Sequence, residues 1–163
     1  LITASRQSSK ITHYDPRCQY GCAILNLTLA KILGGDQNPL RSALNRVEDS
    51  VPEELLDALK PIPHSLQPAD LSSNGYVVDT LQTALYHGLT SPTVEEAIVS
   101  AVNMGGDTDT LGAITGAIAG TRHGATNIPE NWVNKLQGTN KTELTKLADQ
   151  IGTTSYPDSY SER

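Results

Sequence analysis

Apolar residues recur at intervals of three and four positions along most of this chain, which is the spacing of one face of an α-helix. The pattern is clearest over residues 18–33, 77–88 and 94–102, each of which lies between proline or glycine breaks. With no Phe and one Trp, the interior has to be built from Ala, Leu, Ile and Val. Side chains of this size suit helices that pack at short range. The sequence therefore predicts an all-α fold.

Proline and glycine also set the expected helix boundaries. Asp15-Pro16 is a typical helix start, with Asp at the N-cap, and Gly34-Gly35 ends that helix. Residues 1–11 and 152–163 are polar and are expected to form flexible ends, the first of them as a loop or a frayed start. Residues 61–73 hold three prolines and are expected to form a surface loop. Further helices are predicted over residues 38–46, 52–59, 77–88, 92–102, 107–120, 128–136 and 142–151.

The length of 163 residues fits a single domain over residues 1–163, or the C-terminal part of one. The net charge of −6 argues against a nucleic-acid partner, which would need a basic face. No apolar run approaches the length of a membrane span, and no signal-peptide pattern stands at the start. We therefore expect a soluble, cytoplasmic protein with no nucleic-acid and no membrane partner.

Two features of the termini and cysteines limit the function further. The chain begins at Leu1 and its only methionine is Met104, so we expect a fragment or processed piece of a longer protein. Cys18 and Cys22 lack further soft ligands nearby in the sequence, which disfavours a zinc site. We expect them to be buried thiols in a reducing compartment. The histidines at positions 64, 87 and 123 receive no functional role.

Three glycines, Gly112, Gly116 and Gly120, lie four positions apart on one stripe of an expected helix. A glycine inside a helix costs about 1 kcal/mol relative to alanine. Three on one stripe therefore indicate that a neighbouring helix passes unusually close.

The most informative segment for function is Asn103-Met104-Gly105-Gly106-Asp107-Thr108-Asp109-Thr110. It places two carboxylates and two hydroxyls directly after a glycine pair that allows a tight turn. Carboxylates buried at the start of a close-packed helix would need a cation or a full set of donors. A hard divalent cation such as Mg²⁺ or Mn²⁺ prefers these oxygen ligands. Asp107, Asp109 and Thr110 are therefore candidate metal ligands.

Helix capping offers a second interpretation of the same residues. Asp107 could be an ordinary N-cap, and Asp109 could complement the positive end of the helix dipole. Capping accounts for either aspartate but leaves Thr108 and Thr110 unexplained. The local chemistry alone leaves both interpretations open.

Several runs of the sequence carry a resemblance to a known family: Ser73–Leu81, Ala101–Thr110 and Gly112–Ala117, with Thr12–Pro16 upstream and Ile128–Glu130 and Trp132 downstream. Over roughly residues 10 to 137 the chain resembles the ADP-ribosylglycohydrolase family. The glycine-aspartate run is quite specific, whereas the threonine-histidine run alone is a weak signal. The resemblance implies an orthogonal, multi-helix all-α fold with two divalent ions, Mg²⁺ or Mn²⁺, in a cleft.

The resemblance also implies roles for individual residues. Asp107, Asp109 and Thr110 match the C-terminal metal-ligand cluster of the family. His13 matches a histidine that contacts the ADP-ribose diphosphate, and Tyr76 matches a residue that packs against the ligand. For His13 a surface or capping role, and for Tyr76 plain core packing, remain alternatives.

The second metal-ligand cluster of the family, Thr-Asp-Asp, does not occur in this chain. It lies in the N-terminal half of family proteins, together with the acidic residues assigned to proton transfer. The catalytic residues are therefore unknown, the N-terminal half is an expected partner, and this chain alone is expected to be inactive.

The resemblance implies a metal-dependent hydrolase that cleaves the glycosidic bond between ADP-ribose and a protein side chain or small molecule. Its expected partner is then an ADP-ribosylated protein or an ADP-ribose-containing small molecule. The alternative is a non-catalytic relative that binds ADP-ribose or serves a structural, crystallin-like role. A metal-dependent phosphohydrolase is a third interpretation, but no further carboxylate or histidine cluster completes such a site.

Overall fold

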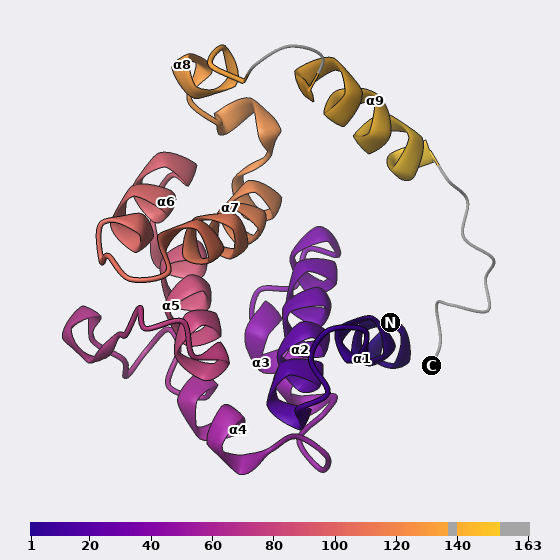
Figure 1. The fold of residues 1–163 in the computed structure, drawn as a ribbon, viewed down its shortest axis with the longest axis vertical. Coiled ribbons are helices and arrows are strands. Elements are labelled where there is room, and N and C mark those ends of the chain that lie inside the picture. Colours follow the sequence, from indigo (N-terminus) through magenta and orange to yellow (C-terminus); the bar gives the residue numbers. More distant parts are fainter. Residues whose placement is uncertain (137–139, 154–163) are drawn as a thin grey trace. The chain divides into compact units, whose positions relative to one another are not determined.

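The computed structural model describes residues 1–136 and 140–153, and in these residues the chain forms helices and no strand (Figure 1). The all-α prediction is confirmed. The α-helices are α1 (Ile2–Lys10), α2 (Pro16–Leu33), α3 (Pro39–Asn45), α4 (Glu53–Leu59), α5 (Val77–Thr90), α6 (Val94–Val102), α7 (Thr108–His123), α8 (Glu130–Val133) and α9 (Asn140–Thr153), and the short 3-10 helices are η1 (Pro68–Asp70) and η2 (Ala125–Asn127).

The chain divides into two compact units, and residues 1–127 form the first with helices α1 to α7. The second unit begins at residue 128 and contains α8 and α9. Most of the tail expected to be flexible, residues 154–163, lies outside the described residues. None of the helices in the described part combines the length and the apolar character needed to cross a lipid bilayer.

The interior of the first unit lies between three long helices. Helix α5 packs along α7, and α2 contacts both of them. Helices α1 and α3 pack on α2, and α6 packs on α7. Aliphatic side chains fill the space between these helices, as the scarcity of aromatic residues predicted. The largest fully buried apolar side chains are Ile24, Leu55, Leu59, Leu85, Leu111, Ile118 and Val94.

The expectation of a loop over residues 1–11 is wrong, because Ile2–Lys10 form helix α1 against α2. Its buried positions are serines, so the segment has no apolar periodicity to recognise. The hydroxyl of Ser5 accepts a hydrogen bond from Asn26 Nδ2 at 2.9 Å. The guanidinium of Arg6 lies 4.3 Å from the centre of the Tyr20 ring. Polar and cation–π contacts thus replace an apolar stripe.

Helix α2 has the predicted boundaries, but its most buried face differs from the expected one. Asp15 caps it by accepting a hydrogen bond from Arg17 N at 2.8 Å. The expectation of two buried thiols is wrong, because Cys22 is exposed and Cys18 half-buried. The core instead receives a neighbouring stripe of the same helix: Tyr20, Ala23, Ile24 and Leu27.

The other predicted helices are found with shifted ends. Helix α8 is shorter than the predicted 128–136, and α9 is longer than the predicted 142–151. The region 61–73 is a loop, as predicted, with η1 inside it.

The glycine stripe of α7 has the predicted role at two of its three positions. A Cβ atom at Gly112 would lie 3.1 Å from Val102 Cγ2, and one at Gly116 would lie 3.4 Å from Ile98 Cδ1. Helix α6 therefore crosses α7 at these two glycines. Gly120 faces open space, so the prediction fails there. The tightest helix contact is elsewhere, where a Cβ atom at Gly88 of α5 would lie 2.7 Å from Ile118 Cβ of α7.

Gly88→Ala should destabilise the protein by about 1–3 kcal/mol, because the added methyl group overpacks the contact between α5 and α7. Gly120→Ala is the matched control, since it adds the same methyl group to a helix where no atom lies within 4 Å. It should stabilise the fold by up to about 1 kcal/mol. Urea unfolding followed by circular dichroism measures both changes. Equal stability of the two variants would contradict the close α5–α7 packing.

Candidate functional site

The turn before α7 is tied to a segment thirty residues earlier in the chain. The N–H of Asp107 donates to the carbonyl oxygen of Ser73 at 3.0 Å. The hydroxyl of Ser73 donates in return to the carbonyl oxygen of Met104 at 3.3 Å. The loop before α5 and the loop before α7 therefore lie side by side. The two runs that carried the strongest family resemblance meet here.

Glycine is required at the centre of this junction. Gly106 has φ of +68°, in the left-handed region that side chains other than glycine rarely adopt. A Cβ atom there would lie 2.9 Å from the carbonyl carbon of Ser73 and closer still to its oxygen. Gly75 of the neighbouring loop also has positive φ, at +80°. A Cβ atom at Gly75 would lie 3.4 Å from Asp107 Oδ2. The carboxylate of Asp107 is thereby held against the Asn74-Gly75 turn.

The two aspartates lie next to each other at the start of α7. Asp107 occupies the N-cap position, but its side chain accepts no capping hydrogen bond. Capping therefore does not explain this carboxylate. The pKa of Asp109 is lowered by a hydrogen bond with the Asp107 side chain, and further by the N–H groups of Asp109 and Thr110. The side chain of Asp107 thus lies next to that of Asp109 at the start of α7.

The expectation that these carboxylates are buried is wrong. Asp107 is half-buried, and Asp109 and Thr110 are exposed. Hydration stabilises their charges, so burial gives no reason for a cation. Their suitability for a divalent metal rests instead on the ligand set, which consists of two adjacent carboxylates and one hydroxyl. Within residues 1–136 and 140–153, no group of three or more His, Cys, Asp or Glu side chains is placed to hold a metal.

That ligand set is a partial fit to Mg²⁺ or Mn²⁺. Hard divalent cations take oxygen ligands, usually six for Mg²⁺, and water commonly fills several of these positions. Asp107, Asp109 and Thr110 provide the correct chemistry but too few protein ligands for a closed site. Further ligands would have to come from water or from another part of a larger protein.

Tyr76 follows the Asn74-Gly75 turn and has a fixed hydroxyl group. Asn74 Oδ1 accepts a hydrogen bond from Tyr76 N at 2.9 Å and so begins helix α5. The Tyr76 hydroxyl donates to Glu54 Oε1 at 2.6 Å and accepts from Arg17 Nη1 at 2.7 Å. The ring also packs against the edge of the core. Core packing and a polar anchor are thus combined in this side chain.

Arg17 joins three acidic or phenolic groups from three helices. It pairs with Asp15 at 2.7 Å and with Glu54 at 3.2 Å. Hydrogen bonds from the Arg17 side chain and backbone lower the pKa of Asp15 to about 2. The Tyr76 hydroxyl and then Arg17 lower the pKa of Glu54, and the Glu54 carboxylate raises that of Tyr76. At neutral pH both carboxylates are therefore ionised and the phenol is neutral.

His13 lies on the loop that leads into α2. Its ring Nδ1 is 2.9 Å from the hydroxyl of Thr12, and its side chain is exposed. Its N–H donates to the carbonyl oxygen of Ser9 at 2.8 Å, which continues α1 into the loop. His13 stands two residues before Asp15, at the end of α2 where Arg17 holds Tyr76. The turn that precedes Tyr76 lies against Asp107, whereas the hydrogen bonds of His13 within the described residues join it only to Ser9 and Thr12.

Sequence reasoning missed Arg17 and Glu54. A signal for Arg17 did exist, because a cation in the first turn of a helix opposes the dipole and usually has an acidic partner. Glu54 gave no such signal, since an acidic residue in the first turn of α4 is favourable on its own.

Comparison with known proteins decides the family. A family model described as ADP-ribosylglycohydrolase matches residues 1–160 of the chain. The chain belongs to the ADP-ribosylglycohydrolase family.

Individual relatives agree with this assignment. The ADP-ribosyl-[dinitrogen reductase] glycohydrolase of Rhodospirillum rubrum is 28% identical over 144 residues, which cover 88% of this chain and 46% of that protein. The ADP-ribosylarginine hydrolase Tri1 of Serratia proteamaculans is 29% identical, over 90% of this chain and 39% of that protein. The human ADP-ribosylhydrolase ARH3 is 29% identical, over 71% of this chain and 33% of that protein.

A solved structure titled "ADP-ribosylglycohydrolase-related protein complex" superposes with a TM-score of 0.78 at 25% sequence identity. The match covers 90% of this chain and 50% of that one. The family fold is therefore confirmed for this chain, which spans about half the length, or less, of the relatives that it matches.

Gly106→Ala should separate the two loops of the candidate site, because the methyl group displaces the Ser73 carbonyl and breaks its bond with Asp107. Gly105→Ala is the control, since Gly105 also has positive φ but no atom lies within 4 Å of its Cβ position. Both variants carry backbone strain of about 1 kcal/mol or more. Only Gly106→Ala should also expose the Asp107 amide to rapid hydrogen exchange. Equal exchange of that amide in both variants would contradict the junction.

Acid should destabilise this fold partly through Asp15. The pKa of Asp15 in the folded state, about 2, lies below the usual 3.8. The ionised Asp15 therefore contributes fully to folding stability above pH 3.8, and this contribution is lost as pH falls through about 2. Asp15→Asn retains an N-cap residue but removes the charge, so its melting temperature should fall less than that of the wild type over this interval. Asp57→Asn alters an exposed carboxylate on α4, away from Asp15, and should show the same dependence of melting temperature on pH as the wild type. Identical acid profiles for wild type and Asp15→Asn would contradict the role of the Arg17 pair.

Proposed function

We propose that this chain forms the C-terminal part of an ADP-ribosyl glycohydrolase that hydrolyses the bond between ADP-ribose and a protein side chain or small molecule. The observation that carries the proposal is the adjacent pair Asp107 and Asp109, held beside the Tyr76 loop by the Ser73 hydrogen bond. Relatives named as hydrolases of ADP-ribosylated dinitrogen reductase and of ADP-ribosylarginine support the substrate class.

In this proposal Asp107, Asp109 and Thr110 hold divalent cations, Mg²⁺ or Mn²⁺, with two ions expected in the complete site. A divalent ion bound there would supply a Lewis-acidic centre for sugar hydroxyls and for a water molecule. The glycine turn and the Ser73 hydrogen bond fix the direction of the Asp107 carboxylate. The hydrogen bond with the Asp107 side chain, and then the N–H groups of Asp109 and Thr110, lower the pKa of Asp109 and favour its ionised form, which is the form that a cation requires.

The remaining residues of the chain would bind the substrate away from the bond that breaks. The ring of Tyr76, held by Glu54 and Arg17, offers a flat surface against which a ribose or base can pack. His13 lies ahead of the N-terminus of α2, where backbone N–H groups favour an anion such as a diphosphate. Binding energy from these remote contacts can orient the anomeric carbon toward the reacting water.

The acid and base for glycosidic cleavage are assigned to another part of the full-length protein. Cleavage builds positive charge on the sugar and needs a carboxyl group for proton transfer. The carboxylates near Tyr76 are held by Arg17, which leaves them poorly suited to that task. We therefore propose that the N-terminal half completes the site and that the chain alone is inactive.

Asp107→Asn and Asp109→Asn should each weaken Mn²⁺ binding to this chain by at least about tenfold, because each removes a charged ligand. Asp49→Asn, which changes an exposed carboxylate outside the site, should bind as the wild type does. Isothermal titration calorimetry with manganese chloride measures all four proteins.

In the full-length protein, release of free ADP-ribose from arginine-, serine- and O-acetyl-linked substrates should disappear with Asp109→Asn or chelator. Turnover retained by Asp109→Asn with full metal dependence would overturn the assignment, and ADP-ribose binding without release would indicate a non-catalytic relative.

A further inference from the structure

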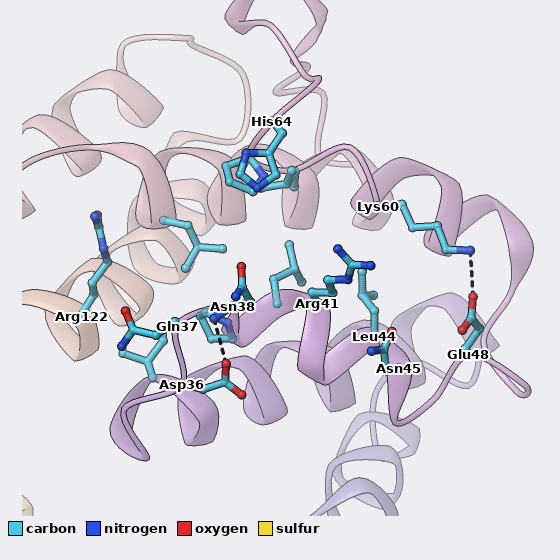
Figure 2. Close-up of a pocket in the computed structure, with 16 residues that line it drawn as sticks. Asp36, Gln37, Asn38, Arg41, Leu44, Asn45, Glu48, Lys60, His64 and Arg122 are labelled. Carbon is cyan, nitrogen blue, oxygen red and sulfur yellow. Dashed lines mark hydrogen bonds and ion pairs between the residues drawn. The ribbon is translucent and has the colours of Figure 1, made fainter.

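A second concave site lies in the first unit, with a cavity of about 750 Å³. Figure 2 shows it between the turn that joins α2 to α3 and the loop that carries His64. Arg122, at the C-terminal end of α7, borders it on another side. Volumes of this size are typical of sites for small organic ligands. The apolar part of its lining comes from Ile32, Leu40, Leu44, Ile62 and Leu89.

The acidic groups of this cavity already have partners. Glu48 pairs with Lys60 at 2.9 Å. Asp36 accepts a hydrogen bond from Asn38 N at 2.8 Å. This bond and another from the Ser42 hydroxyl lower the pKa of Asp36. Lys60 therefore neutralises Glu48, whereas Asp36 is hydrogen bonded by neutral groups and keeps its negative charge.

Two guanidinium groups in the cavity have no carboxylate partner. Arg41 makes no hydrogen bond or ion pair with the described part of the chain, and the same holds for the His64 ring. Within residues 1–136 and 140–153, Arg122 donates to the carbonyl oxygen of Ser91 at 2.7 Å, lies 3.3 Å from Nε2 of His123 and has no carboxylate partner. With Lys60 paired to Glu48, these two guanidinium groups face one remaining carboxylate, that of Asp36, so the lining carries an excess of positive charge. It points to an anionic ligand.

The cavity is separate from the candidate metal and ADP-ribose site. Helix α7 begins at Thr108 beside the two aspartates and ends at His123, next to Arg122. A helix rises 1.5 Å per residue, so Arg122 lies roughly 20 Å from the carboxylates. Lining residues of the cavity include none of Asp107, Asp109, Tyr76 and His13.

We propose that this cavity binds an organic phosphate of about the size of a mononucleotide, at a site independent of the proposed glycohydrolase function. Guanidinium groups match phosphate oxygens in both charge and geometry, which favours Arg41 as the phosphate contact, whereas Arg122 lies on another side of the cavity (Figure 2). The aliphatic floor can receive a flat, weakly polar ring. Asn38 and Asn45 line the same cavity and offer amide donors and acceptors to the edges of that ring.

Calorimetric titration with AMP tests the proposal on the 163-residue chain. Arg41→Gln should weaken AMP binding at least tenfold, since it removes a charge-assisted contact from an exposed side chain that supports no other residue. Arg46→Gln is the matched control, because Arg46 is also exposed on the same short segment but does not line the cavity. Circular dichroism confirms that both variants are folded. Absence of saturable AMP binding, or wild-type affinity in Arg41→Gln, would overturn the proposal.

Two further comparisons identify the site and the chemistry. Adenosine and inorganic phosphate should each bind more weakly than AMP, because adenosine lacks the phosphate and inorganic phosphate lacks the ring. Adenosine affinity equal to that of AMP would refute the role of Arg41. Asp57→Asn, which changes an exposed carboxylate outside both sites, should leave AMP affinity unchanged. Loss of AMP binding in Tyr76→Phe with retention in Arg41→Gln would place the nucleotide at the other site and overturn the inference.

Discussion

The hydrogen bond from Asp107 N–H to the Ser73 carbonyl is the contact on which the candidate site depends. It joins two loops that are far apart in the sequence, and it is possible only because Gly106 adopts positive φ and carries no side chain. Through this one junction, the aspartates at the start of α7 come to lie beside the turn that carries Tyr76. Backbone geometry therefore places Asp107 and Tyr76 in neighbouring loops.

The frame behind this junction is held by short-range helix packing. Gly88 lets α5 approach Ile118 of α7, and Gly112 and Gly116 let α6 approach the other side of α7. Dispersion contacts at such distances are individually small but numerous, and they make a helix position difficult to change. Helix α7 is thus fixed along its length. The carboxylates at its first turn and Arg122 in its last turn are held at opposite ends of one rigid element.

The sequence was informative wherever a local rule decided the structure. Asp15-Pro16 and Gly34 defined the ends of α2, and the resemblance of the glycine-aspartate run was confirmed as membership of the family. Helix α1 was missed because Ser5 and Ser9 occupy its buried positions and give no apolar signal. The contact between Arg17, Glu54 and Tyr76 joins three separate helices, so no spacing in the sequence could reveal it. The exposure of Asp109 was likewise missed, because tertiary packing decides which side of the start of α7 is covered by other elements.

The exposure of the two aspartates also separates folding from metal binding. In small zinc domains the ligands are brought together only by the metal, so the protein unfolds without it. Here the backbone junction places Asp107 and Asp109, and water stabilises their charges, so the fold does not require a cation. In the proposed metal site, affinity would then be determined by the number of ligands rather than by the cost of ordering them. Two carboxylates and one hydroxyl would leave most positions of a divalent ion to water, and ligands from the proposed N-terminal half, by displacing that water, would increase affinity without any change in this chain.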